Sequence, residues 1–433
     1  MKSVAATESE APSRIIHIPR RFTEFEWGGT ETVIYEICRV QQEQRLWQPE
    51  IATSKALDPK AEDAIASVPI KRFNYCYPFF GLSQQDRQLM DKKGGNLFSF
   101  SLLRYLSRTP NVSMLHAHAL KRLGGIVRTA ARWRKIPYVV SLHGGVFDVP
   151  QAELAGMMKP IENKPEWGRV LGAMLGSRRV LEDADHVICV GKSESEQAKE
   201  ELSHDRVSYL PNGVDTSKFD SGDGMKFRKK YDIPEDAYLV LCLSRIDPQK
   251  NQLCLVRAFA QLRKEKPNAH LVLIGPFTHP GYAQQIQDEI KGQGLEAAVQ
   301  LIPGLSNTDP DLINAFHAAN VFVLPSLHEP FGIVVLEAWS CRKPVIASRV
   351  GGLQSVVTHD ETGRFFDPNA DDADSQLAEQ IKFLIDHPEE ARRYADAGRQ
   401  VAVSKYSWAA ISEQLEDIYQ QATTHAQTRW GKS

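Results

Sequence analysis

The chain has 433 residues, a length that predicts two or three domains rather than one. Its hydrophobic content of 42% and charged content of 24% are typical of a globular protein with sizeable cores. The net charge of −2 provides no overall field for nucleic acid or an anionic membrane, so we expect no nucleic-acid partner. No apolar run reaches the ~18 residues that span a bilayer. Residues 1–13 are polar and acidic, which predicts a disordered lead-in rather than a signal peptide.

The six cysteines are scattered along the chain without any Cys-x-x-Cys pair. Several of them lie inside apolar segments, which predicts buried, reduced thiols. This pattern favours a cytoplasmic protein.

The first predicted unit is a strand at residues 14–19, a glycine-containing loop and an amphipathic helix from about residue 30. Gly28 and Gly29 permit backbone conformations closed to other residues and bring N–H groups near an anion. The loop contains no Gly-x-Gly-x-x-Gly, so it is not a dinucleotide fingerprint. A simple turn is the alternative.

Strands are predicted next at residues 49–53, 69–73, 112–118 and 138–145. The last two place His116, His118 and His143 near strand carboxyl ends. Three imidazoles suggest a zinc site. However, their spacing fits no structural zinc site and no nearby acidic residue completes a known pattern, so no metal is predicted.

A basic helical segment, residues 121–135, lies between these two strands. It is interpreted first as a solvated helix face. The alternatives are a docking face for the inner surface of a membrane and a subsite for a phosphorylated acceptor. Lys121 and Arg122 directly follow the strand-end histidines, so they are the candidates for an acceptor contact.

The segment 179–193 predicts a helix, a strand and a second helix start, and residues 207–224 form a polar, Gly-containing linker. Further strands are predicted near residues 238–243, 269–276, 299–304, 344–348 and 365–368. Helices follow at 374–386, 388–405 and 407–421, and the tail after Thr423 is expected to be disordered. Strands alternating with helices in both halves predict an α/β fold with two doubly wound domains.

Two cations flank the turn after the strand at 238–243. Arg245 follows the strand and Lys250 lies at the next helix start, near Asn251. A guanidinium fork and an ammonium at a strand-to-helix turn suit a diphosphate. A pair of ordinary surface cations is the alternative.

The most informative stretch is residues 321–340, a buried strand to Leu324, a turn with Pro330 and Gly332, and a helix from about Ile333. Glu329 lies on the turn and Glu337 lies on the helix. In parallel α/β sheets ligands bind outside the strand carboxyl ends, where a helix N-terminus favours anions. The unit therefore predicts a site for a molecule with hydroxyls and phosphates. A solvated Glu329 with Glu337 favouring the helix dipole by only ~0.3–1 kcal/mol is the alternative.

The string Glu-Pro-Phe-Gly-Ile-Val-Val-Leu-Glu at 329–337 resembles the signature of retaining nucleotide-sugar glycosyltransferases, most closely glycosyltransferase family 4 with the GT-B fold. Pro-Val-Ile-Ala-Ser-Arg-Val-Gly-Gly at 344–352 and Pro-Asn-Gly-Val-Asp at 211–215 are similar to family segments. So are His-x-His at 116–118 and Ser-x-His-Gly at 141–144. Many members have Gly-Arg-Leu and Lys-Gly around the two cations, whereas this chain has Ser-Arg-Ile and Lys-Asn, with both cations retained. The resemblance covers about residues 14–421.

The resemblance implies two Rossmann-like domains facing a central cleft. The acceptor-side domain would be 14–210 with a crossover helix at 407–421, and the nucleotide-sugar-binding domain would be 211–406. It implies a hexosyltransferase that moves a sugar from a nucleoside-diphosphate sugar to a hydroxyl of a carbohydrate, lipid, polyol or phosphorylated acceptor. Retention is expected through front-face attack, without a metal or other cofactor. UDP and GDP are the favoured donor nucleotides, but the sequence does not reveal the base, because the implied main-chain contacts to it leave no residue signature.

The resemblance also assigns residue roles. The implied catalytic residues are His143, Glu329, Arg245 and Lys250. The implied donor-binding residues are Gly28, Gly29, Arg245, Lys250, Glu329, Phe331, Gly332, Ile333 and Glu337. The acceptor-side candidates are His116, His118, Lys121 and Arg122. A nucleotide-sugar epimerase and a catalytically inactive nucleotide-sugar-binding protein are the alternative functions.

Overall fold

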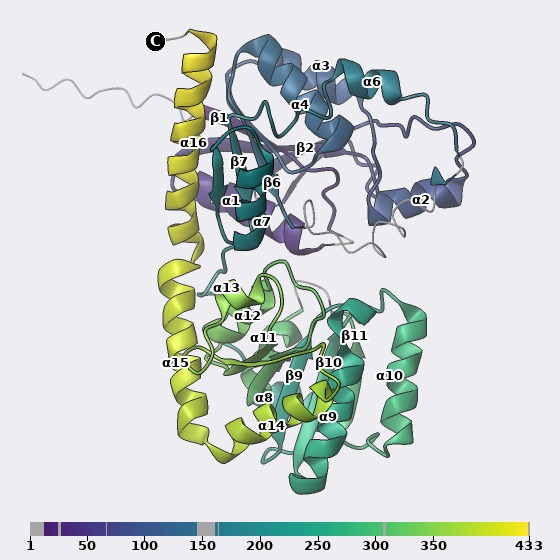
Figure 1. Ribbon diagram of the computed structural model, residues 1–433, viewed down its shortest axis with the longest axis vertical. Coiled ribbons are helices and arrows are strands. Elements are labelled where there is room, and N and C mark those ends of the chain that lie inside the picture. The colour runs from purple at the N-terminus through teal and green to yellow at the C-terminus, as the bar shows by residue number, and fades with distance from the viewer. Residues whose placement is uncertain are drawn as a thin grey trace, which may run out of the picture. The chain divides into compact units, whose positions relative to one another are not determined.

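The computed structural model describes residues 13–24, 27–65, 67–144, 161–162, 164–305 and 309–431. The chain forms two compact units (Figure 1). Unit 1 contains residues up to Val190, Glu194–Leu210 and the segment from Ser412 on, and unit 2 contains Gly191–Ser193 and Pro211–Ile411.

Unit 1 is built on an eight-stranded sheet with the order β3-β4-β2-β1-β5-β6-β7-β8. Every neighbouring pair is parallel except β3–β4. The strands are β1 (Ser13–Ile18), β2 (Trp47–Ser54), β3 (Glu62–Ile65), β4 (Val68–Phe73), β5 (Val112–Ala117), β6 (Tyr138–Leu142), β7 (His186–Cys189) and β8 (Val207–Tyr209). The strand order reverses between β1 and β5, which places a ligand-binding switch point at their carboxyl ends.

Helices cover both faces of this sheet, and each face has its own core. Ile16 and Ile18 pack in a core with Leu102, Ile126 and other residues of α3 and α4, while α1 packs on the other face in a second core with residues of β2 and β4. The helices of unit 1 are α1 (Gly29–Glu43), α2 (Gln84–Lys93), α3 (Phe100–Arg108), α4 (Lys121–Arg134), α6 (Arg169–Met174) and α7 (Lys192–Glu201).

Unit 2 is built on a six-stranded sheet with the order β11-β10-β9-β12-β13-β14, in which all pairs are parallel. The strands are β9 (Tyr238–Leu243), β10 (Ala269–Gly275), β11 (Val299–Pro303), β12 (Val321–Leu324), β13 (Val345–Ser348) and β14 (Arg364–Phe366). This is a doubly wound order whose switch point lies between β9 and β12. Both strands are followed by the charged turns that the sequence singles out.

The apolar run of β9 has a core on each side. Leu239 and Leu241 belong to one cluster, whereas Val240 and Cys242 belong to the other. Parallel strands buried on both faces are apolar throughout, as this one is. The helices are α8 (Gly224–Lys230), the short 3-10 helix η2 (Pro248–Lys250), α9 (Gln252–Glu265), α10 (Pro280–Gly292), α11 (Asp311–Ala318), α12 (Ile333–Ser340), α13 (Leu353–Val356), α14 (Ala373–Asp386) and α15 (Pro388–Lys405).

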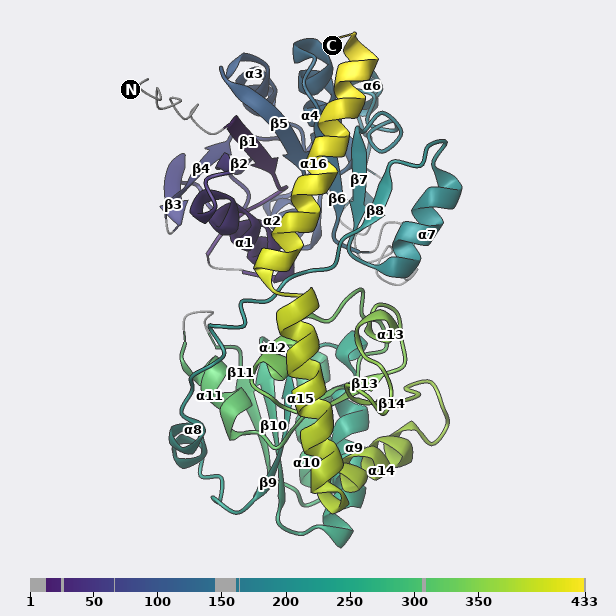
Figure 2. The same ribbon diagram turned by 90° about the vertical axis from the view of Figure 1, so that its left-hand side faces the viewer.

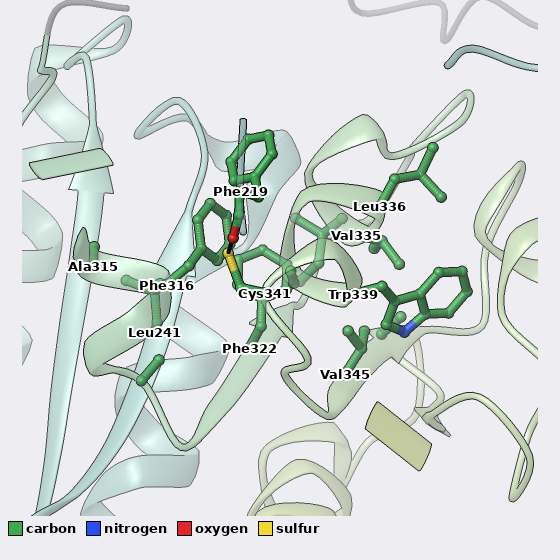
Figure 3. Packing of buried hydrophobic residues seen from close by; sticks show 14 of the residues in the cluster. Phe219, Leu241, Ala315, Phe316, Phe322, Val335, Leu336, Trp339, Cys341 and Val345 are labelled. Atoms are coloured by element: carbon green, nitrogen blue, oxygen red, sulfur yellow. Dashed lines mark hydrogen bonds between the residues drawn. The ribbon is translucent and has the colours of Figure 1, made fainter. Parts of the chain in front are cut away.

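The first of these cores anchors α12. Val335, Leu336 and Trp339 of the helix are fully buried in the same cluster as Phe322 of β12 (Figure 3). The Trp339 indole N–H donates to the Thr362 carbonyl at 3.0 Å. Packing of this extent fixes the helix, so its N-terminus is held in place at the end of β12.

The last helix, α16 (Trp408–Trp430), corrects the prediction that the chain is disordered after Thr423 (Figure 2). Ala426 is 2% exposed and packs on unit 1. The His425 Nδ1 lies 2.8 Å from one Asp185 carboxylate oxygen, and Arg429 donates to the other at 3.0 Å. The prediction was wrong because the polar residues at 423–430 find a buried carboxylate that is distant in sequence.

All six cysteines are free thiols, and five of them are buried, as predicted. Within the described ranges, every helix is too short or too polar to cross a membrane.

Candidate active site

In unit 2 the two charged turns at the switch point contact each other. The Leu327 amide N–H donates to the Gln249 carbonyl at 2.8 Å. The Lys250 ammonium lies 2.5 Å from the Glu329 carboxylate, and both side chains are about one-eighth exposed, at 13% and 12%. The fold therefore brings together the predicted cation and the predicted carboxylate, which are 79 residues apart in sequence.

Gly332 gives the turn its shape. It precedes α12 with φ +90°, a conformation that residues with a Cβ rarely adopt. A Cβ there would also lie 2.6 Å from Leu353 Cδ2. Within the described part of the chain, the amides of Phe331, Gly332 and Ile333 have no backbone acceptor. Open amides at a helix N-terminus attract an anion.

Gly351 and Gly352 support this turn from behind. The Gly352 N–H donates to the Glu329 carbonyl at 2.8 Å. A Cβ on Gly352 would lie 1.9 Å from the Pro330 carbonyl oxygen, and one on Gly351 would lie 2.6 Å from the Glu329 carbonyl oxygen. Both glycines are thus required for close packing against the turn.

Arg245 is the exposed member of the group, with 51% of its side chain accessible. Its guanidinium contacts Gln249 at 3.3 Å and Asp247 at 3.8 Å. Contacts of this length in an exposed position hold a side chain weakly. Arg245 is therefore available to an incoming anion.

Glu337 lies one turn into α12 and is half-buried. Burial raises the pKa of its carboxyl to about 7, and the positive charge of Lys218 opposes this shift. Among the residues that the structure describes, no hydrogen-bond donor is assigned to it. A carboxylate without a partner is ready to accept hydrogen bonds from ligand hydroxyls.

In unit 1 a pocket of about 310 Å³ lies at the carboxyl ends of the central strands. Its wall includes His118, Lys121 and His143 of the predicted set, and also Arg20 and Thr30. The Arg20 guanidinium donates hydrogen bonds to the carbonyls of Met90 and Asp91. The pocket therefore combines two cations with two imidazoles.

The histidines form a hydrogen-bonded chain that the sequence prediction missed in part. His17 of β1 lies 3.0 Å from His118, and His118 lies 2.9 Å from His143. Gln41 of α1 contacts the far side of His17 at 3.0 Å. The signal in the sequence was the position of His17, a polar residue inside the apolar strand β1.

His116 lies on a separate branch inside unit 1 and does not line the pocket. Its ring nitrogens contact the Tyr419 hydroxyl and the Ser141 hydroxyl, both at 2.7 Å. It is fully buried. This placement favours a positioning role for His116 over the predicted acceptor contact.

His17, His116 and His118 have ring nitrogens within 4.8 Å of one another, close enough to ligate one metal ion. Both nitrogens of each ring already contact a protein group. A metal would have to displace several of these hydrogen bonds, so the donor set fits an ion poorly.

Arg122 and Gly28 differ from their predicted roles. Arg122 is 2% exposed; it forms an ion pair with Glu166 and donates to the Asn96 carbonyl at 2.8 Å, so it holds the unit together and does not line the pocket. Gly28 has φ −128°, which any residue can adopt, and its N–H donates to Glu31 at 3.1 Å. Neither the special backbone conformation nor the free amide expected at Gly28 is present, while Gly29 is the first residue of α1.

Two family models and a curated relative match most of this chain. Residues 27–218 match the family model described as Glycosyltransferase Family 4, and residues 224–401 match the model described as Glycosyl transferases group 1. A D-inositol 3-phosphate glycosyltransferase of Kineococcus radiotolerans is 30% identical over 364 residues, covering 80% of this chain and 79% of the relative. The chain belongs to glycosyltransferase family 4.

A second relative and two solved structures agree with this assignment. The alpha-maltose-1-phosphate synthase of Mycolicibacterium smegmatis is 30% identical over 66% of this chain and 76% of its own length. The Anabaena HepE structure with UDP and glucose has a TM-score of 0.69 at 19% identity and covers 94% of this chain and 98% of its own. Sucrose-phosphate synthase of Thermosynechococcus elongatus has a TM-score of 0.70 at 22% identity, with coverages of 94% and 98%. The predicted GT-B fold and glycosyltransferase class, a hexosyltransferase, are confirmed.

Proposed function

We propose that this family 4 enzyme transfers a sugar from a nucleoside-diphosphate sugar to a hydroxyl of a phosphorylated polyol or sugar, with retention of anomeric configuration. The observation that carries the proposal is the switch point of unit 2. There, Lys250, Glu329 and the open amides before α12 come together in one turn cluster. Cations, amides and carboxylates in this arrangement match the phosphates and hydroxyls of such a donor.

The diphosphate is assigned to Arg245, Lys250 and the amides of Phe331–Ile333. Arg245 supplies an exposed guanidinium, and the helix N-terminus supplies directed N–H groups. These groups stabilise the charge that develops on the leaving diphosphate, which is the largest electrostatic demand of the reaction. The ribose hydroxyls are assigned to Glu337, whose carboxylate has no other donor among the described residues.

Glu329 is assigned to the sugar hydroxyls. Its hydrogen bond to Lys250 fixes the carboxylate. The Lys250 ammonium has three N–H donors, so the others can bind a phosphate oxygen. Glu329 is thus a positioning group for the sugar rather than a nucleophile. Attack then occurs on the face from which the diphosphate departs, and the leaving phosphate oxygen takes the acceptor proton.

UDP is the favoured nucleotide. HepE, a fold neighbour, was solved with UDP and with UDP-glucose. The acceptor is assigned to the pocket of unit 1, where Lys121 and Arg20 offer positive charge and His143 offers a ring nitrogen. The names of the two relatives, an inositol-phosphate glycosyltransferase and a maltose-phosphate synthase, point to phosphorylated acceptors of this kind.

A transfer assay tests the proposal. UDP-glucose is incubated with inositol 3-phosphate, glucose 1-phosphate or their unphosphorylated forms, and products are identified by mass. We expect a phosphorylated glycoside and one UDP per product, with Lys121→Met raising the KM of the phosphorylated acceptor more than that of the neutral one. Conversion of the donor without an acceptor would support the epimerase alternative and overturn the proposal.

A further inference from the structure

A continuous hydrogen-bonded chain runs from the interior of unit 1 to its pocket. It starts at the Gln41 side-chain oxygen, 3.0 Å from His17 Nε2, and continues from His17 Nδ1 to His118 Nε2 at 3.0 Å. The last link joins His118 Nδ1 to His143 Nε2 at 2.9 Å. His143 lines the pocket, and its Nδ1 is the one ring nitrogen of the chain without a partner among the described residues.

The chain has only two possible proton arrangements, because a neutral imidazole carries one donor and one acceptor nitrogen. A ring that donates at one end must accept at the other, so each link fixes the next. If the proton lies on His17 Nε2, it lies on His118 Nε2 and on His143 Nε2 as well. If the His17–His118 hydrogen bond runs in the opposite direction, the proton lies on Nδ1 in all three rings.

The Gln41 amide decides between the two arrangements. Its carbonyl oxygen faces His17, and an oxygen can only accept, so His17 Nε2 carries the proton. The amide nitrogen lies on the other side, where it donates to the Tyr419 hydroxyl at 3.4 Å. The Tyr419 hydroxyl in turn lies 2.7 Å from His116 Nδ1, and when it donates to that nitrogen it can only accept from Gln41, which keeps the amide in this orientation.

Burial keeps the rings neutral, as this argument requires. It lowers the pKa of His17 and of His143 to about 4 and that of His118 well below its ordinary value. At neutral pH each ring therefore carries one proton. The charges that act on the pKa of His118 are those of other histidines, and Arg20 and Lys121 share the pocket wall with His143.

We propose that Gln41 sets the tautomer of His143 through the two intervening histidines. His143 then presents an unprotonated Nδ1 to the pocket, which accepts a hydrogen bond and cannot donate one. This inference rests on the proposed function. It means that His143 binds a neutral hydroxyl of the sugar or polyol in preference to a phosphate oxygen or a carbonyl. Gln41 and His17 act as positioning residues, since neither lines the pocket.

The test is ¹⁵N NMR of the histidine rings in the full-length protein, with His143 assigned by the signal lost in His143→Asn. The wild type is expected to show His143 protonated on Nε2 and bare on Nδ1. In Gln41→Met the ratio of tautomers should shift roughly fivefold toward Nδ1–H, the factor that one neutral hydrogen bond contributes. Gln42→Met, on the same helix with its amide bonded to the Ser67 carbonyl, should leave the tautomer unchanged.

The wild-type spectrum needs no variant, so the proposal stays testable even where Gln41→Met does not fold. Nδ1–H on His143 in the wild type would overturn it, as would an unchanged tautomer in folded Gln41→Met. A second readout is turnover of UDP-glucose, where Gln41→Met is expected to lower kcat severalfold with little change in the donor KM. If no donor is turned over by the wild type, the proposed function fails while the NMR result still decides the tautomer.

Discussion

Glu337 provides the sharpest prediction, because burial places its pKa at about 7 and its proposed ligands are hydroxyl donors. In the proposed complex the ionised carboxylate would accept hydrogen bonds from both ribose hydroxyls, whereas the protonated form would lose acceptor capacity. Donor affinity should therefore rise with pH through the folded-state pKa. With a pKa near 7, about nine-tenths of Glu337 is ionised at pH 8 and about one-tenth at pH 6. The wild-type affinity should therefore be roughly tenfold lower at pH 6 than at pH 8.

The assay is calorimetric titration with UDP-glucose, whose diphosphate carries no proton near neutrality and adds no titration of its own. Glu337→Gln should weaken binding at pH 8 at least tenfold, since a charge-assisted hydrogen bond contributes about 1.5–3 kcal/mol. The variant should also lose the pH dependence. Glu379→Gln, an exposed carboxylate on α14, is the matched control and should keep it. A wild-type affinity that is flat between pH 6 and pH 8, or a variant that retains the slope, would refute the ribose assignment.

Three further predictions test the surrounding structure. Lys250→Met should weaken UDP-glucose binding about tenfold or more through loss of a buried cation, and unchanged affinity in calorimetry would exclude Lys250 from the donor site. Gly332→Ala should lower the free energy of unfolding by at least ~1–2 kcal/mol because of its positive φ, whereas Gly292→Ala, whose Cβ meets open space at the end of α10, should be neutral or stabilising in the same urea titration. Arg429→Met should cost about 1–3 kcal/mol by removing a donor from the fully buried Asp185; an unchanged midpoint would show that the end of α16 contributes nothing to stability.

The strand, turn and helix at residues 321–340 were predicted well because their sequence signals are local. The strand at Val321–Leu324 and the helix start at Ile333 are confirmed. A buried strand is apolar, a turn carries Pro and Gly, and the helix begins where the pattern changes. The charges of Lys250 and Glu329 were predicted to serve one site, and their contact follows from the adjacency of β9 and β12.

The features that the sequence did not predict depend on contacts between segments far apart in sequence. His17 and His118 are 101 residues apart, and His116 and Tyr419 are 303 apart. The burial of Arg122 depends on Glu166 and Asn96, and neither residue marks itself in the sequence as a partner. The last turns of α16 depend on Asp185 in the same way. In each case a polar side chain gains its role from the tertiary fold, which periodicity and spacing do not encode.

The central claim is transfer with retention from a nucleoside-diphosphate sugar, and one experiment tests it most directly. UDP-glucose, whose anomeric configuration is α, is incubated with the enzyme and the best phosphorylated acceptor, and the product is followed by ¹H NMR of the anomeric proton. The account predicts an α-linked glucoside that accumulates in step with released UDP. A β-linked product would contradict the retaining mechanism, and the absence of nucleoside-diphosphate release from every common nucleotide sugar would contradict the donor site itself.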